Sequence, residues 1–213
     1  MGIQERRGRE KEQRRNEILN AAEKVFFSKG FNQSTMDEVA ETAELSKGTL
    51  YLYFKNKEDL YFAITYRSMT ILRSMFKDAV KQHKKGIEKV RAIGRAYHRF
   101  SQDYKNYFNM MMHFEAVQNS LNLDACVFDE MHLHGQSVMQ VLVEAIQTGV
   151  DDGSIRSNID PLKTAFLLNG VSSGIIHLIA RESQHIKKME AFEPEELMDT
   201  FFDFTVNALK PKE

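Results

Sequence analysis

The sequence predicts an all-α protein, and three observations lead to that fold class. Only three prolines occur among the 213 residues, at Pro161, Pro194 and Pro211, so long helices can run without interruption. No stretch alternates β-branched and polar residues over several positions, as a half-buried strand would. Apolar residues recur instead every three or four positions, which is the period of an amphipathic helix.

The composition is ordinary for a soluble globular chain, with 42% hydrophobic and 28% charged residues. The net charge of −1 at pH 7 does not indicate a nucleic-acid partner. Such a partner can be inferred only from the positions of individual charged residues. A single cysteine, Cys126, excludes an internal disulfide framework and a cysteine-based zinc site.

The chain is also expected to be cytoplasmic, with no membrane partner. Its start, MGIQERRGREKEQRR, is too charged for a secretory signal. The most apolar stretch, AFLLNGVSSGIIHLIA at 165–180, is too short and too polar to span a bilayer. We therefore predict that 165–180 is a buried helix.

The first 57 residues are predicted to form three helices. The first runs from about residue 11 to 28 and ends before Gly30, which suits a left-handed cap. The second begins after Thr35, which forms a capping box with Glu38, and ends near residue 43. The third covers residues 47–54 after the cap Ser46. Two short helices joined by about three residues are a helix-turn-helix arrangement.

The third helix has a predicted core side and a predicted outer side. At about 100° per residue, Leu50 and Phe54 point the same way and belong to the core. Gly48 costs about 1 kcal/mol relative to alanine, which is reasonable where a foreign surface approaches the backbone. The alternative is that the tyrosines are half-buried core residues and Gly48 belongs to a loop. The outer face and its rim comprise Gly48, Thr49, Leu52, Tyr51 and Tyr53.

The remaining residues, 58–213, are predicted to form a larger helical domain. Its helices are expected at about 57–84, 87–104, 106–118, 124–149, 161–184 and 194–209, the first beginning at the cap Asn56. The clearest loop is TGVDDGSIRSNIDP at 148–161, with Asp160 as cap and Pro161 at the first helical position.

The segment FFSKGFNQSTMDEVAETAELSKGTLYLYFKNKEDLY resembles the N-terminal DNA-binding domain of the TetR/AcrR family of bacterial transcriptional regulators. The resemblance covers about residues 14–62, and the run Ser-x-Gly-Thr-Leu-Tyr-x-Tyr-Phe-x-Asn-Lys-Glu is specific. It implies an arm and helix-turn-helix domain at 1–57 and a ligand-binding and dimerisation domain at 58–213. Glu44 departs from the family, which commonly has glycine in the turn, and a side chain there is expected in an unusual backbone region.

The resemblance implies a set of contacts to double-stranded DNA. Amides at the start of the second helix would meet a phosphate, the start of the third helix would enter the major groove, and phenols and a lysine would hold the backbone. Basic side chains of the first helix would add phosphate or minor-groove contacts. The residues so implied are Thr35, Lys47, Gly48, Thr49, Tyr51, Leu52, Tyr53, Lys57, Arg14 and Arg15.

The resemblance also implies a homodimer, in which the last two long helices of each chain form a four-helix bundle. Small residues in PLKTAFLLNGVSSGIIHLIA permit close approach of a partner helix. Closure of the monomer's own core by these two helices is the alternative. A two-fold dimer would read a pseudo-palindromic operator. The predicted interface residues are Leu167, Gly170, Val171, Gly174, Leu178, Phe201, Phe202 and Phe204.

A small-molecule effector is the third implied partner. The stretch FSQDYKNYFNMMMHFEAV at 100–117 combines methionine and aromatic side chains, which adapt to varied apolar ligands. A plain core stripe is the alternative. The candidate ligand residues are Phe100, Tyr104, Tyr107, Phe108, Met111, Met112, His113 and Glu115.

No motif predicts catalysis, a cofactor or a metal. A di-iron bundle needs two Glu-x-x-His pairs, and one such spacing occurs, at Glu182 and His185. Two functions remain open. The first is a ligand-responsive repressor that binds a pseudo-palindromic operator and is released by a small, largely apolar effector. The second is a helical ligand- or metal-binding bundle without a DNA role. DNA affinity that falls steeply with salt would distinguish them.

Overall fold

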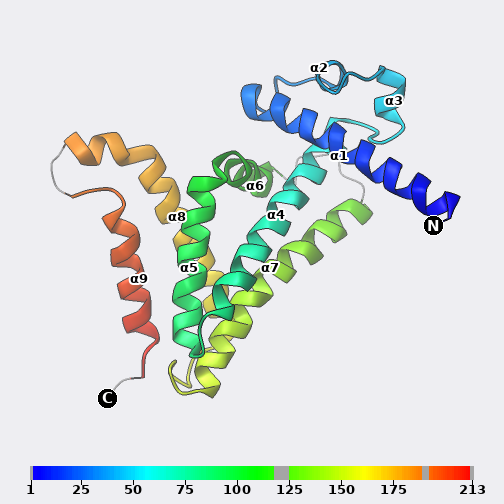
Figure 1. Ribbon diagram of the computed structural model, residues 1–213. Coiled ribbons are helices and arrows are strands. Elements are labelled where there is room, and N and C mark those ends of the chain that lie inside the picture. The colour runs from blue at the N-terminus through cyan, green and yellow to red at the C-terminus, as the bar shows by residue number, and fades with distance from the viewer. Residues whose placement is uncertain (1, 118–124, 189–191, 212–213) are drawn as a thin grey trace. The chain divides into compact units, whose positions relative to one another are not determined.

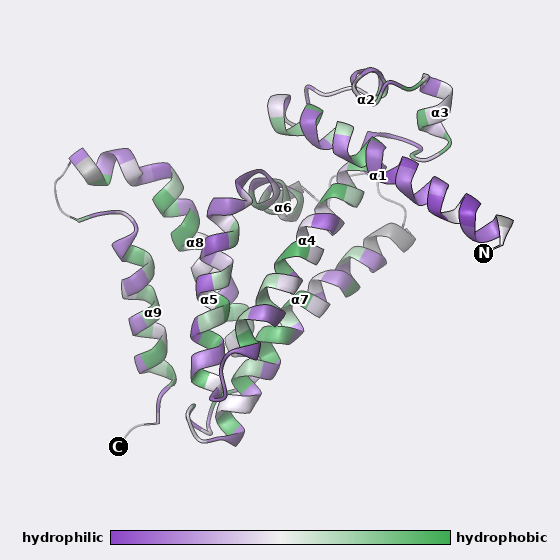
Figure 2. Cartoon of the chain, in the orientation of Figure 1, coloured by the Kyte–Doolittle hydropathy of each residue, from purple (hydrophilic) through white to green (hydrophobic). Residues whose placement is uncertain are grey.

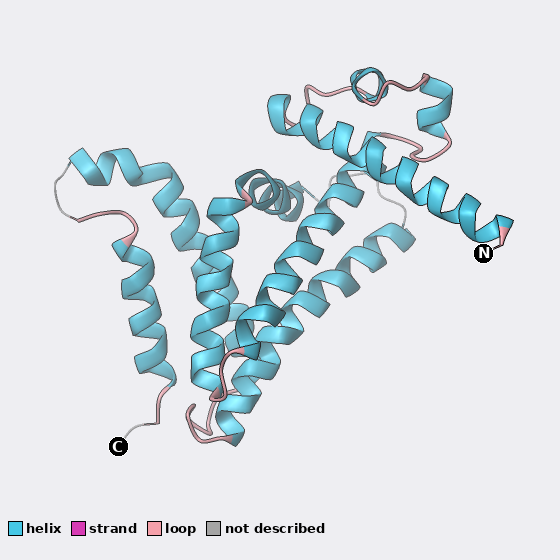
Figure 3. Cartoon of the chain, viewed as in Figure 1, coloured by secondary structure: helices cyan, strands magenta, loops and turns pink. Residues whose placement is uncertain are grey.

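The computed structural model describes residues 2–117, 125–188 and 192–211, and every regular element among them is a helix (Figures 1 and 3). The prediction of an all-α fold is therefore confirmed. The helices are α1 (Ile3–Lys29), α2 (Met36–Thr42), α3 (Lys47–Tyr51), α4 (Lys57–Lys81), α5 (Gly86–Asp103), α6 (Lys105–Val117), α7 (Ala125–Asp151), α8 (Pro161–Lys188) and α9 (Glu196–Leu209).

The chain divides into two compact units. The first comprises Met1–Ser68 and Met110–Met131, and the second comprises Met69–Asn109 and His132–Glu213. The expected boundary at residue 57 falls at the start of α4, whereas the first unit continues to Ser68. Leu60, Tyr61 and Ile64 explain the difference, because all three are buried in the first unit.

Helix α1 begins at Ile3, eight residues before its predicted start at residue 11. The added turns carry few apolar residues, as the hydrophilic colouring of this end shows (Figure 2). A polar pair one turn apart supports them instead: Arg6 Nε lies 2.8 Å from Glu10 Oε1. Each such pair contributes about 0.2–0.5 kcal/mol to a helix. The segment expected as a flexible basic arm is therefore helical.

In the first unit α1 packs on α2, and α2 packs on α3. Their shared core contains Ile18, Phe26, Val39, Leu50 and Phe54, all of which are buried. These positions include the apolar stripes that the sequence predicts, so the core side of the third helix is confirmed.

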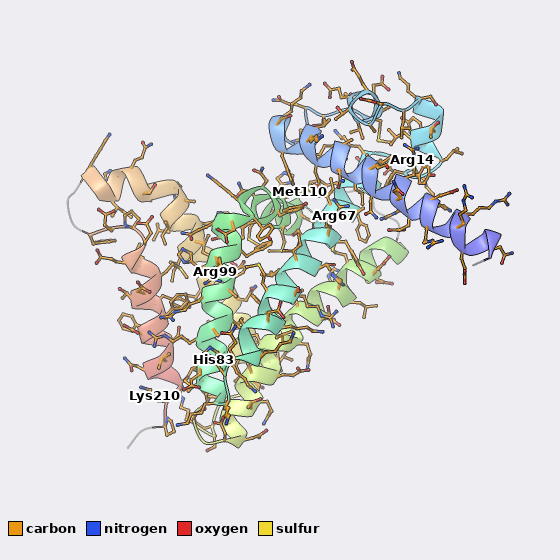
Figure 4. All side chains as sticks on the ribbon, viewed as in Figure 1. Arg14, Arg67, His83, Arg99, Met110 and Lys210 are labelled. Carbon is orange, nitrogen blue, oxygen red and sulfur yellow. The ribbon has the colours of Figure 1, made fainter. Side chains whose placement is uncertain are left out.

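Arg67 of α4 ties the same unit together. Its guanidinium donates to Glu23 Oε1 over 2.7 Å, to Asn20 Oδ1 over 2.8 Å and to Asn16 Oδ1 over 3.0 Å (Figure 4 labels Arg67). The ion pair with Glu23 is mostly buried, so solvent screens it less than the surface pairs of α1.

The second unit is built on contacts of α5 with α8 and α9, and of α8 with α9. Its tightest approach joins the start of α5 to the end of α7: a Cβ added at Gly86 would lie 2.0 Å from the Gly149 nitrogen. In the following loop, Asp152 Oδ2 accepts from the Gly86 amide over 2.8 Å. The predicted cap before Pro161 is confirmed, because Asp160 accepts from the Lys163 amide over 3.0 Å.

Helix α8 corrects one prediction, because the stretch 165–180 is not a buried helix in the single chain. Phe166, Leu167 and Val171 are exposed, and only one side of α8 faces α5 and α9. Within the described residues, one helix, Pro161–Ile186, is long and apolar enough to cross a membrane by length and composition alone, which is weak evidence for a membrane location.

Candidate nucleic-acid interface

The start of α2 is fixed by the predicted capping box. The Thr35 hydroxyl accepts from the Glu38 amide over 3.2 Å, and Glu38 Oε2 accepts from the Thr35 amide over 3.0 Å. Lys29 of α1 also pairs with Glu38. The Lys29 hydrogen bond, followed by that of the Thr35 amide, holds the pKa of Glu38 below its ordinary value. Thr35 therefore acts as a cap, and its backbone amide is already used.

The turn from α2 to α3 contains Glu44, whose φ of 54° lies in the left-handed region. The expectation of an unusual backbone here is confirmed. The Glu44 amide donates to the Glu41 carbonyl over 3.0 Å, and the Leu45 amide donates to the Ala40 carbonyl over 2.9 Å. These two bonds close the end of α2 and set the direction in which α3 begins.

Helix α3 starts at its predicted cap and ends earlier than predicted. Ser46 Oγ accepts from the Thr49 amide over 3.2 Å and shares a hydrogen bond with the Thr49 hydroxyl over 2.8 Å. The helix covers residues Lys47–Tyr51 and not 47–54. Phe54 still donates to the Leu50 carbonyl over 3.1 Å, so the last turn keeps both core residues on one side.

Tyr51 at the end of α3 and Leu52 directly after it are exposed among the described residues. Leu52 is 81% exposed and Tyr51 is 49% exposed, while Leu50 on the opposite side is fully buried. A Cβ added at Gly48 would meet just one described atom within 4 Å, Ser46 Oγ at 3.9 Å. Packing within the described chain therefore gives no reason for glycine at position 48. Tyr53 is half-buried at the rim.

Lys47 and Lys57 have different surroundings. Lys47 Nζ lies 2.6 Å from Asp37 Oδ2 of α2, and both side chains are exposed. Lys57 Nζ donates to the carbonyl oxygens of Phe31 over 2.8 Å and Ser34 over 3.0 Å, and lies over the Phe31 ring at 4.4 Å from its centroid. Lys57 thus holds the loop between α1 and α2, and its expected contact with the DNA backbone stays a prediction.

The two basic residues of α1 also differ. Arg14 is exposed and pairs with Glu17 over 2.8 Å (Figure 4). The Arg15 guanidinium lies 5.0 Å from the centroid of the Phe54 ring, where its charge meets the negative ring face. Sequence reasoning did not single out Lys55, which is exposed, lies two positions after Tyr53 and forms no ion pair with any described residue. The run KNK is the signal that could have identified it.

The candidate effector residues are split between the two units. In the second unit Phe100 and Phe108 are buried, and the Phe100 ring stacks on Tyr104 with 5.6 Å between centroids. Tyr107 is half-buried. This part of the stripe is therefore aromatic core with Tyr104 at its surface.

In the first unit Met111 is buried, Met112 is half-buried and His113 is exposed. The Tyr61 hydroxyl lies 2.7 Å from His113 Nδ1 and donates to the Met110 carbonyl over 3.0 Å. The Glu115 side chain lies outside the described residues.

The expected dimer residues gather on exposed surfaces of α8 and α9, with one exception. Leu167, Gly170, Val171, Gly174 and Leu178 are all exposed and recur every three or four positions along α8. On α9, Phe204 is 72% exposed and Phe201 is half-buried.

Phe202 is the exception, because it is buried in its own chain. Its ring lies where a Cβ at Gly94 of α5 would come within 2.8 Å. Phe202 therefore belongs to the contact between α5 and α9.

No cluster that could hold a metal ion occurs in the described part of the chain, where groups of three or more His, Cys, Asp or Glu side chains are absent. The site is thus a capped helix-turn-helix with an exposed apolar face.

Comparison with known proteins identifies the class. Residues 18–64 match the family described as bacterial regulatory proteins of the tetR family. The transcriptional activator FasR of Mycolicibacterium smegmatis is 30% identical over 164 residues, which cover 70% of this chain and 75% of FasR. The fatty acid metabolism regulator protein of Bacillus subtilis is 24% identical and covers 68% of this chain and 72% of its own length.

Solved structures agree on the fold. The regulator FadR from Bacillus subtilis, in complex with stearoyl-CoA, aligns with a TM-score of 0.69 at 17% identity, covering 91% of this chain and 98% of FadR. A tetR-family regulatory protein from Rhodococcus RHA1 aligns with a TM-score of 0.71 at 16% identity, covering 94% of this chain and 98% of that protein.

The fold and the helix-turn-helix define a DNA-binding transcriptional regulator. The chain belongs to the TetR family, and as a member it is a ligand-responsive regulator. The alternative of a helical bundle without a DNA role is thereby set aside.

Proposed function

We propose that this regulator binds a pseudo-palindromic operator as a homodimer, with α3 of each chain in successive major grooves. The observation that carries the proposal is the outer face of α3. Leu52 and Tyr51 are exposed there, and the space beside Gly48 is unfilled within the described chain. Leu52 directly follows the five-residue helix, and its exposed side chain can pack against an apolar base edge such as the thymine methyl.

The contacts are proposed to divide into two kinds. Gly48, Thr49 and Leu52 meet base edges, since they form the outer face of α3. Lys47, Tyr51, Tyr53, Lys55 and Arg14 are proposed to meet phosphates at the rim, and the cap of α2 at Thr35 brings that helix terminus to the backbone.

Lys57 and Arg15 are proposed to act indirectly. Lys57 uses its ammonium on the carbonyls of the α1–α2 loop, and Arg15 packs on Phe54 below α3. Both side chains would therefore fix the helix-turn-helix domain of residues 1–57 in shape and leave direct phosphate contacts to more exposed residues.

The dimer is proposed to form through α8 and α9. The stripe Leu167, Gly170, Val171, Gly174 and Leu178 leaves apolar surface uncovered over three turns of α8. Two such stripes can pack closely because glycines lower the helix separation, and Phe204 of α9 would lie beside them. Burial of this surface stabilises the dimer by about 25 cal/mol per Å² of apolar area.

Repression by operator binding, with release by a small and largely apolar effector, is the proposed mode of action. Relatives support a lipid-like effector: FadR is described with stearoyl-CoA, and KstR2 of Mycobacterium tuberculosis is described as a ketosteroid transcriptional regulator. The effector would shift the protein to a state whose two α3 helices no longer match the groove spacing. We also propose that the protein works in the cytoplasm and catalyses no reaction.

The test is selection of fragments from the host genome by purified protein, followed by affinity measurements from about 50 to 200 mM salt. For a protein that makes about six to ten phosphate contacts, this rise in salt should weaken DNA binding about 10³- to 10⁵-fold. Leu52→Ala and Tyr51→Phe should weaken the selected site. The matched control is Leu133→Ala, since Leu133 is an exposed leucine on α7 in the second unit. No selected site from a folded protein would refute the proposal, as would equal effects of Leu133→Ala and Leu52→Ala.

A further inference from the structure

The second unit contains a pocket of about 630 Å³ that the regulator function described so far does not use. Its walls come from the last turns of α4, the turn after it, and one face of α5. None of the residues that line it belongs to the candidate effector stripe at 100–115 or to the exposed stripe of α8. The volume lies within the range of about 300–1,000 Å³ that is common for small-molecule sites.

One wall of the pocket is a row of arginines. Arg91, Arg95 and Arg99 are spaced four residues apart, so they lie on one face of α5, about 6 Å from one to the next along the axis. Arg91 pairs with Asp203 of α9 over 3.0 Å. Arg95 and Arg99 form no ion pair with any described residue, although both border the pocket. Two guanidinium groups are thus available to an incoming anion.

The floor of the same pocket is apolar. Met75 and Ala79 of α4 face Ala92 and Ala96 of α5, and Ala96 is buried. Alanine leaves room beside the helix backbone, and methionine adapts its shape to an apolar group. The pocket therefore offers an apolar surface beside arginines that form no ion pair with a described residue.

The acidic side chains of the pocket lie at its other end. Asp78 pairs with Lys81 over 2.8 Å, and Glu88 lies 4.0 Å from His83 Nδ1. His83 and Arg99 come from opposite ends of this wall, His83 before α5 and Arg99 near its end (Figure 4 labels both). The pocket is polarised, with its uncompensated positive charge at Arg95 and Arg99.

We propose that this pocket binds a small organic phosphate, with the phosphate on Arg95 and Arg99 and an apolar group on the alanine and methionine floor. Arginine recognises phosphate through paired N–H groups, and guanidinium groups from successive turns of one helix face can donate to the same phosphate. A neutral apolar compound would make no ionic contact with Arg95 or Arg99. Inorganic phosphate would bury none of the apolar surface of the floor.

The test is isothermal titration calorimetry on the full chain without DNA, so a failure here leaves the operator selection untouched. The probes are hexyl phosphate, which carries both chemical features, and inorganic phosphate and hexanol, which carry one each. Hexyl phosphate should bind saturably and about tenfold or more tightly than either of the others. The double variant Arg95→Gln/Arg99→Gln should lose about tenfold or more in affinity, since charged hydrogen bonds contribute more than neutral ones.

The matched control removes the same charge elsewhere in the unit. Lys77→Gln/Lys105→Gln changes two exposed lysines that do not line the pocket, and it should bind hexyl phosphate as the parent does. Equal loss in both double variants would mean that only net charge matters, and the proposal would be overturned. Absence of saturable binding at millimolar hexyl phosphate would overturn it as well, as would equal affinity for hexanol.

Discussion

Replacing Glu44 with glycine should stabilise the first unit. The φ of 54° at this position brings the Cβ of any L residue close to its own carbonyl, which costs about 1–2 kcal/mol relative to ordinary helical backbone. Glycine removes that cost because it has no Cβ. The free energy of unfolding should therefore rise after Glu44→Gly.

The size of the effect follows from two opposing contributions. Relief of the left-handed conformation gains about 1–2 kcal/mol. Glycine also raises the conformational entropy of the unfolded chain, which lowers the free energy of unfolding by about 0.4–1 kcal/mol. The net stabilisation should lie between about 0 and 1.6 kcal/mol, with a middle value of about 0.8 kcal/mol. For a chain of this length, about 1 kcal/mol corresponds to a rise of about 2–4 °C in Tm.

Hydrogen exchange of the helix-turn-helix amides is the appropriate assay, because the chain has two compact units and a single melting curve mixes them. The Leu45 amide, bonded to the Ala40 carbonyl over 2.9 Å, reports directly on opening of the turn. Glu44→Ala is the control, since it removes the charge and keeps the Cβ. If Glu44→Gly protects Leu45 no better than Glu44→Ala, the backbone argument is refuted.

Three further predictions concern Lys57, Gly86 and Asp152. Lys57→Met should destabilise the first unit by about 2 kcal/mol, because two loop carbonyls lose a charged donor, and urea denaturation beside Lys57→Arg measures this. Gly86→Ala should destabilise the second unit by about 3 kcal/mol or more, since the new Cβ meets the Gly149 backbone, which cannot move away as a side chain could. The control Gly135→Ala has open space inside α7 and should instead stabilise the unit by up to about 1 kcal/mol, because alanine favours a helix more than glycine does; hydrogen exchange of second-unit amides measures both changes. The Ser154 hydroxyl first, and the Gly86 amide next, hold the pKa of Asp152 below its ordinary value. The stability this gives is present above about pH 3.9 and is lost as the pH falls through the lower folded pKa, so Asp152→Asn should be less stable than the parent at pH 7, and this difference should shrink as the pH is lowered. A difference that stays constant as the pH is lowered would contradict the carboxylate's role.

Caps and core stripes were predictable because their causes are local. Thr35, Ser46, Asn56 and Asp160 each accept a backbone amide at the helix start, as a short polar side chain before an apolar run predicts. The core side of α3 followed from the 100° step alone. The left-handed backbone at Glu44 followed from the resemblance, because the family commonly has glycine at this place in the turn.

Other features depend on contacts that no local pattern encodes. The polar start of α1 has no apolar stripe, so periodicity could not find it. Lys57 reads as a surface lysine in the sequence, and only the fold brings the carbonyls of Phe31 and Ser34 to it. An apolar stripe such as that of α8 predicts burial without saying whether the covering surface belongs to the same chain. The pocket arginines are four residues apart, a spacing that charged residues on many solvated helix faces share. The apolar floor beside them, which the sequence does not reveal, distinguishes them from such residues.

The ion pair between Lys47 and Asp37 has a consequence for how the protein searches DNA. The Lys47 ammonium already has a counter-ion 2.6 Å away on α2, so in the phosphate contact that we propose for Lys47 the phosphate competes with a carboxylate that remains tethered nearby. The few contacts made on unrelated DNA offset little of the free energy needed to break the ion pair. A matched operator adds base contacts, which offset it more fully. Asp37 would thus shorten the residence time on random sequence more than on the operator. The Asp37→Asn variant should dwell longer on unrelated DNA and find its operator more slowly in a long molecule.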